Sequence, residues 1–173
     1  MNKDLKLNIG ITLWTLTSKE IRRFMRIWVQ TLVPPAVTMT LYFVIFGSLI
    51  GPRIGEMDGF DYVQFMIPGL IMMSVITGSY ANVVSSFYSV KFQKSIEELL
   101  ISPMPNWVIL LGFILGGVTR GILVGIIVFC VSLFFYPEFQ IANIGLTITV
   151  LLLTSVLFAL MGFINAVFAD SFD

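Results

Sequence analysis

The residue types that carry most enzyme chemistry are scarce in this sequence. Histidine is absent and Cys130 is the single cysteine, so a His/Cys metal cluster, an intramolecular disulfide and a Ser-His-Asp triad are all excluded. Glu56, Asp58 and Asp61 lie close together, but their segment lacks the ligand series of a calcium loop. We therefore interpret them as a solvated acidic loop and expect Cys130 to be a small buried residue, and we predict no catalytic, metal or cofactor site.

Glycine is concentrated in one long apolar segment. The glycines lie four residues apart in two series, Gly112 and Gly116, then Gly117, Gly121 and Gly125. No GK[ST] sequence follows them, so they do not form a nucleotide-binding loop, and no such loop occurs elsewhere in the chain. Any ATP and Mg²⁺ would then be bound by another polypeptide. The spacing predicts two ridges of small residues that let neighbouring helices approach closely.

Arg120 is the only charged residue in that segment, 107–136. Placing an arginine against lipid costs about 2.5–3.5 kcal/mol even on a lenient insertion scale, so we expect Arg120 to face protein or water. It is either a substrate or gating contact for an anionic group, or a structural charge bound by carbonyls and polar groups of neighbouring helices. We favour the structural interpretation.

The composition places these residues in a membrane. Of 173 residues, 57% are hydrophobic and 12% are charged, whereas soluble domains contain roughly 25% charged residues. The formal net charge is zero, so no basic field attracts nucleic acid. A spanning helix needs about 20 mostly apolar residues, and four segments meet this length: 27–50, 62–90, 107–136 and 144–169. The predicted fold is all-α and polytopic, with a transmembrane domain over 27–169.

Lys and Arg residues are distributed unevenly between the two sides of these spans. Most of them precede the first span, in residues 1–26, and Lys91 and Lys94 follow the second span. Between the first two spans, Arg53 is the only basic residue. Because cytoplasmic loops are rich in Lys and Arg, we predict a cytoplasmic N terminus and a cytoplasmic end at 170–173.

The segment that precedes the first span has an apolar and a basic face when drawn as a helix. The apolar face contains Trp14, Ile21, Phe24, Met25 and Trp28, and the basic face contains Lys19, Arg22, Arg23 and Arg26. This pattern is typical of a helix lying in the membrane interface, although Leu16 lies among the charged residues. We expect a lipid anchor. The alternative is an elbow that contacts a partner and leads into the first span.

The loop 91–106 contains a second, shorter amphipathic pattern. Phe92, Ile96, Leu99 and Leu100 lie on one face, and Lys91, Lys94, Glu97 and Glu98 lie on the other. Lys94 and Glu98 are spaced for an i,i+4 ion pair, and Pro103 and Pro105 end the helix. A helix this short is marginal alone, so either the bilayer surface or a soluble partner must cover its apolar face. The spacing leaves both open.

The order of these segments resembles the permease subunits of ABC type-2 exporters. The resemblance rests on KEIRRFMRIWVQTLVPPAVTMTLYFVIFGSLIG (19–51), FMIPGLIMMSVITGSYANVVSSF (65–87) and KFQKSIEELLISPMP (91–105), and it covers nearly the whole chain. It implies a protein of the bacterial inner membrane that pairs with a second permease copy and with separate ATPase subunits. The implied cargo is a drug or an amphiphilic or lipid-linked compound.

The resemblance also assigns roles to the two amphipathic segments. Residues 10–26 would be an in-plane connecting helix that borders the ATPase. The loop 91–106 would carry the coupling helix, with these residues at or near the ATPase: Phe92, Lys94, Ile96, Glu97, Glu98, Leu99 and Pro103. Family members continue past Asp173 for two more spans, so we expect a permease that is truncated at its C-terminal end. The alternative is a truncated membrane protein that serves in interaction or assembly and does not transport.

Overall fold

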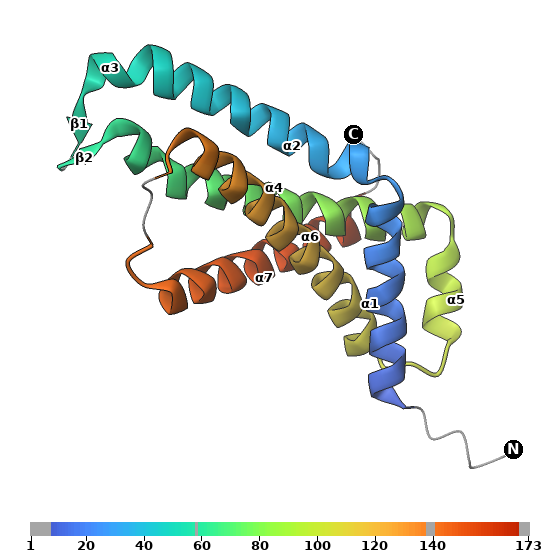
Figure 1. Ribbon diagram of the computed structural model, residues 1–173. Helices are drawn as coiled ribbons and strands as arrows, with labels where there is room; N and C mark the ends of the chain where they lie inside the picture. The colour runs from blue at the N-terminus through green and yellow to red at the C-terminus, as the bar shows by residue number, and fades with distance from the viewer. Residues whose placement is uncertain (1–7, 58, 138–140, 170–173) are drawn as a thin grey trace, which may run out of the picture.

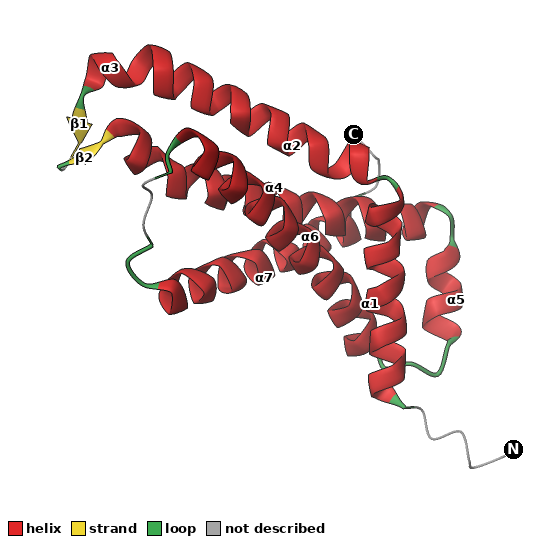
Figure 2. Ribbon diagram, in the orientation of Figure 1, coloured by secondary structure: helices red, strands yellow, loops and turns green. Residues whose placement is uncertain are grey.

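The four apolar segments form four long helices. The computed structural model describes residues 8–57, 59–137 and 141–169, and the predicted end at 170–173 lies outside them. The helices are α1 (Ile9–Arg26), α2 (Trp28–Tyr42), the π-helix η1 (Phe43–Ile50), α3 (Gly51–Ile54), α4 (Tyr62–Phe92), α5 (Ser95–Ile101), α6 (Asn106–Phe135) and α7 (Ile144–Phe168). Figures 1 and 2 show that helices make up nearly all of this part of the chain.

Four helical stretches are long and apolar enough to cross a membrane. They are Trp28–Ile54, which joins α2, η1 and α3, and the single helices Tyr62–Phe92, Asn106–Phe135 and Ile144–Phe168. These bounds agree with the four predicted spans, and the all-α polytopic fold class is confirmed.

The first two spans are connected by a small hairpin of two strands. Strands β1 (Glu56–Met57) and β2 (Phe60–Asp61) pair antiparallel, with Glu56 opposite Asp61. Gly59 in the turn has a φ of 82°, a conformation that suits a residue without a side chain. Asp58, the third acid of this segment, lies outside the described residues. The hairpin brings α3 and the start of α4 together at one end of the molecule (Figure 1).

Helices α4 and α6 pack against each other at the centre, and close approach at glycine makes this possible. A Cβ atom at Gly121 would lie 1.9 Å from the Ser79 hydroxyl and 2.9 Å from the Val75 carbonyl oxygen. A Cβ atom at Gly117 would lie 2.4 Å from a Val83 methyl group. The ridge of Gly117, Gly121 and Gly125 therefore faces α4, where only hydrogen fits between the two helices.

Helix α1 packs along the first half of α6 and then leads through Ile27 into α2 (Figure 1). Leu16 and Glu20 of α1 occupy the space above Gly112 and Gly116, where added Cβ atoms would lie 2.3 Å and 2.6 Å from these side chains. The other glycine ridge thus faces α1.

The buried face of α1 differs from the predicted one. Leu16, Glu20 and Phe24 are buried, one turn apart, whereas we expected Phe24 on the membrane face and Leu16 among solvated charges. Trp14, Met25 and Trp28 are exposed. The amphipathic pattern sorts residues by polarity alone, whereas burial here follows the space beside the glycines of α6, which Leu16 and Glu20 fill.

Candidate functional site at the junction of helices α1, α4 and α6

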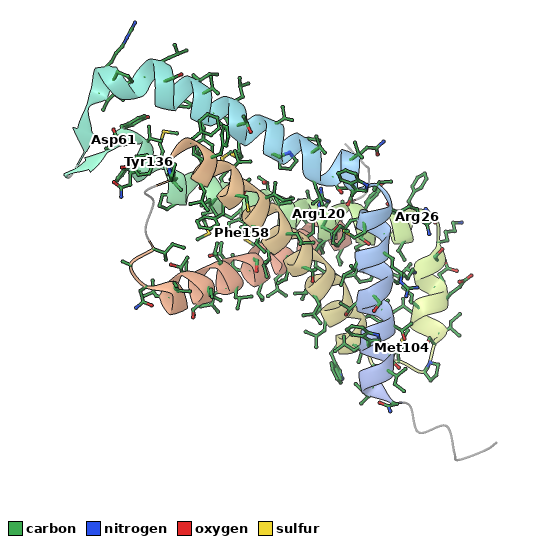
Figure 3. All side chains as sticks on the ribbon, in the orientation of Figure 1. Arg26, Asp61, Met104, Arg120, Tyr136 and Phe158 are labelled. Atoms are coloured by element: carbon green, nitrogen blue, oxygen red, sulfur yellow. The ribbon has the colours of Figure 1, made fainter. Side chains whose placement is uncertain are left out.

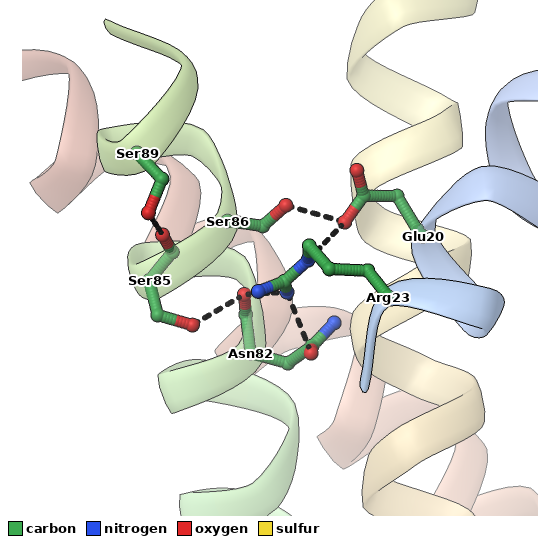
Figure 4. A network of polar contacts seen from close by, with 6 residues as sticks. All are labelled: Glu20, Arg23, Asn82, Ser85, Ser86 and Ser89. Atoms are coloured by element: carbon green, nitrogen blue, oxygen red, sulfur yellow. Dashed lines mark hydrogen bonds and ion pairs between the residues drawn. The ribbon is translucent and has the colours of Figure 1, made fainter. Parts of the chain in front are cut away.

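A buried carboxylate lies where α1 meets α4 and α6. Glu20 is 1% exposed, and its Oε2 atom accepts a hydrogen bond from Arg23 Nε at 3.2 Å and another from the Ser86 hydroxyl (Figure 4). An unpaired charge in an apolar interior is costly. The ion pair and the serine therefore satisfy this carboxylate at the helix junction.

Arg23 continues the network from α1 to α4. Its Nη2 atom donates to the backbone carbonyl of Asn82 at 3.2 Å and to the side-chain Oδ1 of Asn82 at 3.0 Å. The carbonyl of Asn82 also accepts from the Ser85 hydroxyl at 3.2 Å. Asn82 and Ser86 are fully buried, so the network ties the first helix to the second span through groups shielded from water.

The network lies at the end of the molecule where the first span begins. Arg23 is five residues before Trp28, the first residue of that span. Asn82 is in the half of α4 that leads toward α5, ten residues from Phe92, the last residue of α4.

Arg120 extends the polar cluster toward the elbow between α1 and α2. Its Nη2 atom donates to the Thr31 carbonyl at 3.4 Å, a long contact for a charged donor. The Thr31 hydroxyl donates to the Phe24 carbonyl at 3.2 Å, which joins the end of α1 to the start of α2. Arg120 thus faces protein, at the point where the chain turns into its first span (Figure 3).

The basic residues of α1 separate into two groups in the structure. Lys19, Arg22 and Arg26 are exposed, whereas Arg23 turns inward with its side chain 33% exposed. Arg23 was grouped with the other three because a wheel of one helix contains no information on neighbouring helices. Trp14 is also exposed, so four of the five residues predicted for an interfacial anchor face outward, and the anchor itself stays a prediction.

The sequence analysis did not identify Glu20, although a signal for it exists. Glu20 lies four residues from both Leu16 and Phe24 and three residues before Arg23. An acid that lies four residues from an apolar residue on either side shares their helix face, and a basic residue three positions later can pair with it. This pattern indicates an acid on a buried face. Matching that line to the four-residue spacing of Gly112 and Gly116 would have pointed to a contact with α6.

Helix α5 begins later than predicted. Lys94 has a φ of 56°, so the helix starts at Ser95 and the chain changes direction after Phe92. Phe92 belongs to α4 and is 78% exposed, while Lys94 lies before α5 and forms no ion pair with Glu98 within the described part of the chain. The left-handed residue separates two segments that a single helical wheel had joined.

The predicted apolar face of α5 is only partly covered. Ile96 and Leu99 pack against the cluster that includes Phe87 and Phe113, whereas Leu100 is exposed. Glu97, Glu98 and Pro103 are also exposed. The protein itself therefore holds one side of α5 in place, and the acids and Leu100 face outward.

Lys91 has a structural contact that its place in the loop did not reveal. Its Nζ atom donates to the carbonyls of Val167 at 2.9 Å and Ala169 at 2.6 Å. These carbonyls lie at the C-terminal end of α7, where the helix dipole favours a cation. Lys91 therefore fastens the last span to the end of the second.

Two further expectations concern Cys130 and metal binding. Cys130 is exposed on α6, and the expectation of a buried residue was wrong because the apolar surroundings that suggested burial include outward faces of spanning helices. Within the described ranges, no group of three or more His, Cys, Asp or Glu side chains is placed to hold a metal ion.

Comparisons with known proteins agree with this architecture. Residues 12–173 match the ABC-2 type transporter family. The inner membrane transport permease YadH of Escherichia coli strain K12 is 60% identical over 163 residues, which are 94% of this chain and 63% of that protein. The permeases of the same name from E. coli O157:H7 and Shigella flexneri match to the same extent.

The chain spans 63% of the length of these relatives, and no solved structure matches it. The family match covers most of α1, the four spans and the short helix α5 that separates the second span from the third. On this evidence the chain belongs to the ABC-2 type transporter family.

Proposed function

We propose that this chain acts as the membrane-spanning permease subunit of an ABC exporter in a bacterial inner membrane. It forms part of the translocation path together with a second copy of itself, and a separate ABC ATPase binds ATP and Mg²⁺. The family membership, the four spans and the similarity to inner membrane transport permeases support this proposal.

The observation that carries the proposal is the position of α5. This helix of seven residues has no buried residue, yet it connects the ends of α4 and α6, the two helices packed most closely in the molecule. A force applied to α5 by a soluble protein is therefore transmitted directly to both central spans. Glu97 and Glu98, both exposed, give a basic groove on an ATPase two charges to bind.

The distribution of charge supports an orientation with α5 in the cytoplasm. Exposed basic residues of α1 and the lysines Lys91 and Lys94 lie at the α5 end. Arg53 lies in α3, at the opposite end of the spans (Figure 1). The positive-inside rule then assigns the α5 end to the cytoplasm, where ATP is available.

The test is a reversal of charge on α5. Membranes from cells that express the affinity-tagged chain are solubilised and the chain is purified. The ABC ATPase that co-purifies is identified by mass spectrometry and quantified. The double variant Glu97→Lys/Glu98→Lys should retain at least tenfold less ATPase than the wild type. The matched control, Glu56→Lys/Asp61→Lys, makes the same change of charge at the opposite end and should retain the wild-type amount.

Two results would contradict this proposal. Equal ATPase recovery with both double variants would remove α5 from the interface. A wild-type chain that reaches the membrane but never recovers an ATPase would instead support a membrane protein that serves in interaction or assembly and does not transport.

A further inference from the structure

The junction of α1, α4 and α6 contains more positive than negative charge. The Glu20 carboxylate is shared between Arg23 and Ser86. Arg120 has no carboxylate within ion-pair distance in the described part of the chain. It is one turn after Gly116, where an added Cβ atom would lie 2.6 Å from Glu20 and 3.7 Å from Asn82 Nδ2. One Glu and two Arg residues leave a net charge of +1 at the edge of the hydrocarbon.

Four buried side-chain atoms of the described residues have no hydrogen-bond partner: the hydroxyls of Thr17 and Ser79, the side-chain Nδ2 of Asn82 and Arg120 Nε. The last two are N–H donors of this junction, which, unlike hydroxyls, cannot accept a hydrogen bond instead. Asn82 itself is 0% exposed, and its Oδ1 already accepts from Arg23. Buried donors are nearly always paired in native proteins, so these two indicate an acceptor that is supplied from outside the chain.

The contact of Arg120 with the first span suits a ligand near the membrane surface. Its Nη2 atom donates to the carbonyl of Thr31, which is three residues after Trp28, where the first span begins. Three residues are about 5 Å of helix, so the guanidinium lies near the end of that span, within the reach of an extended arginine side chain.

We propose that this junction binds a phosphate group between Arg23 and Arg120, with the Asn82 side-chain amide as an additional donor. Planar guanidinium groups pair with phosphate oxygens in a bidentate manner, and a phosphate has enough acceptor oxygens for two arginines and an amide. Arg23 is one-third exposed, which leaves a way in. The phosphate belongs either to the headgroup of an anionic phospholipid or to a soluble anion.

This site does not depend on the coupling role of α5. Its charge balance predicts opposite effects for two isosteric substitutions. Arg120→Gln lowers the local charge from +1 to 0 and removes one guanidinium, so it weakens phosphate binding. Glu20→Gln raises the charge to +2 and still provides an oxygen to accept from Arg23, so it strengthens binding.

The experiment measures binding of phosphate-bearing ligands to the purified chain in detergent micelles. Dioleoylphosphatidylglycerol, inorganic phosphate and dioleoylglycerol, which has the same acyl chains but no phosphate, are titrated separately, and the apparent Kd is obtained from the shift in thermal unfolding. We expect binding of phosphatidylglycerol at least tenfold tighter than that of dioleoylglycerol. Arg120→Gln should weaken phosphatidylglycerol binding at least tenfold, Glu20→Gln should strengthen it severalfold, and Arg53→Gln in α3 should leave it unchanged.

Each outcome bears on the site. Preference for phosphatidylglycerol without binding of inorganic phosphate identifies a headgroup, and competition by inorganic phosphate identifies a soluble anion. If phosphatidylglycerol and dioleoylglycerol bind equally and inorganic phosphate does not bind, the site does not exist. The same conclusion follows if the two Gln variants shift binding in the same direction. If Arg120→Gln does not yield folded protein, the tighter phosphatidylglycerol binding expected for Glu20→Gln tests the site alone, and unchanged or weaker binding by that variant contradicts it.

Discussion

The inner pair of spans, α4 and α6, differs from the outer pair, the α2 span and α7. In their most apolar stretches, 39% and 33% of the residues of α4 and α6 are buried, against 11% for each outer span. All four are apolar enough to cross a membrane, so apolar character does not determine which helices lie at the centre. Small and polar residues do, because lipid tails are as apolar as leucine and provide no hydrophobic force between helices.

The inner spans show this selection directly. Helix α6 presents glycines to both of its neighbours, and α4 buries a series of polar residues: Ser74, Ser79, Asn82 and Ser86. By contrast, the outer spans expose many large apolar side chains, such as Val37 of α2 and Leu153 of α7. These faces suit lipid or further protein. The inner faces are committed to contacts within the chain.

The largest expected effect comes from filling the close contact between α4 and α6. In Gly121→Leu the new side chain meets Ser79 and the Val75 carbonyl, and overpacking of a tight contact costs about 1–3 kcal/mol, occasionally more. We expect a loss of most monodisperse protein in size-exclusion chromatography, and a lower free energy of unfolding in detergent for the remainder.

The matched control for this substitution is Gly69→Leu. Gly69 also lies in a spanning helix, but a Cβ atom there would meet nothing within 4 Å. The free energy of unfolding of Gly69→Leu should stay within about 0.5 kcal/mol of the wild-type value. Equal losses for both variants would show that glycine acts through backbone flexibility and not through close packing.

A smaller effect is expected from removing the buried acid. Glu20→Ala leaves Arg23 and the Ser86 hydroxyl without their shared acceptor, and hydrogen bonds to charged groups contribute about 1.5–3 kcal/mol. We expect this decrease in the free energy of unfolding, together with faster proteolysis of α1. Glu97→Ala, an exposed acid on α5, should change stability by less than about 0.5 kcal/mol. If the two alanine variants were equally stable, the junction would not hold α1 in place.

The smallest effect concerns the attachment of an outer span. Lys91→Met keeps a long side chain but removes the cation from the end of α7, where such an interaction contributes about 0.3–1 kcal/mol. Hydrogen exchange of the last turn of α7 should become faster while exchange in α6 stays unchanged. Lys94→Met, at an exposed position, should leave both rates unaltered. Unchanged exchange in Lys91→Met would mean that packing alone fixes this end.

Much of the fold was predictable because it depends on local properties. The length of each apolar segment sets the number of spans, and the Lys and Arg residues that interrupt them set the loops. Prediction was less accurate at α5, where the left-handed conformation of Lys94 shifted the start of the helix by several residues. The glycine spacing in α6 predicted close contacts, but not that one ridge would meet α1 and the other α4.

The sequence by itself determined that this chain is a polytopic membrane protein with four spans and without a nucleotide-binding loop, because these features follow from composition and contiguous motifs. Only the tertiary structure decided that Glu20, Arg23, Asn82, Ser86 and Arg120 meet at one junction. These residues come from three helices separated by up to a hundred positions. Their proximity depends on how glycine ridges position the helices, and that packing is a property of pairs of surfaces, which the pattern of a single helix does not contain.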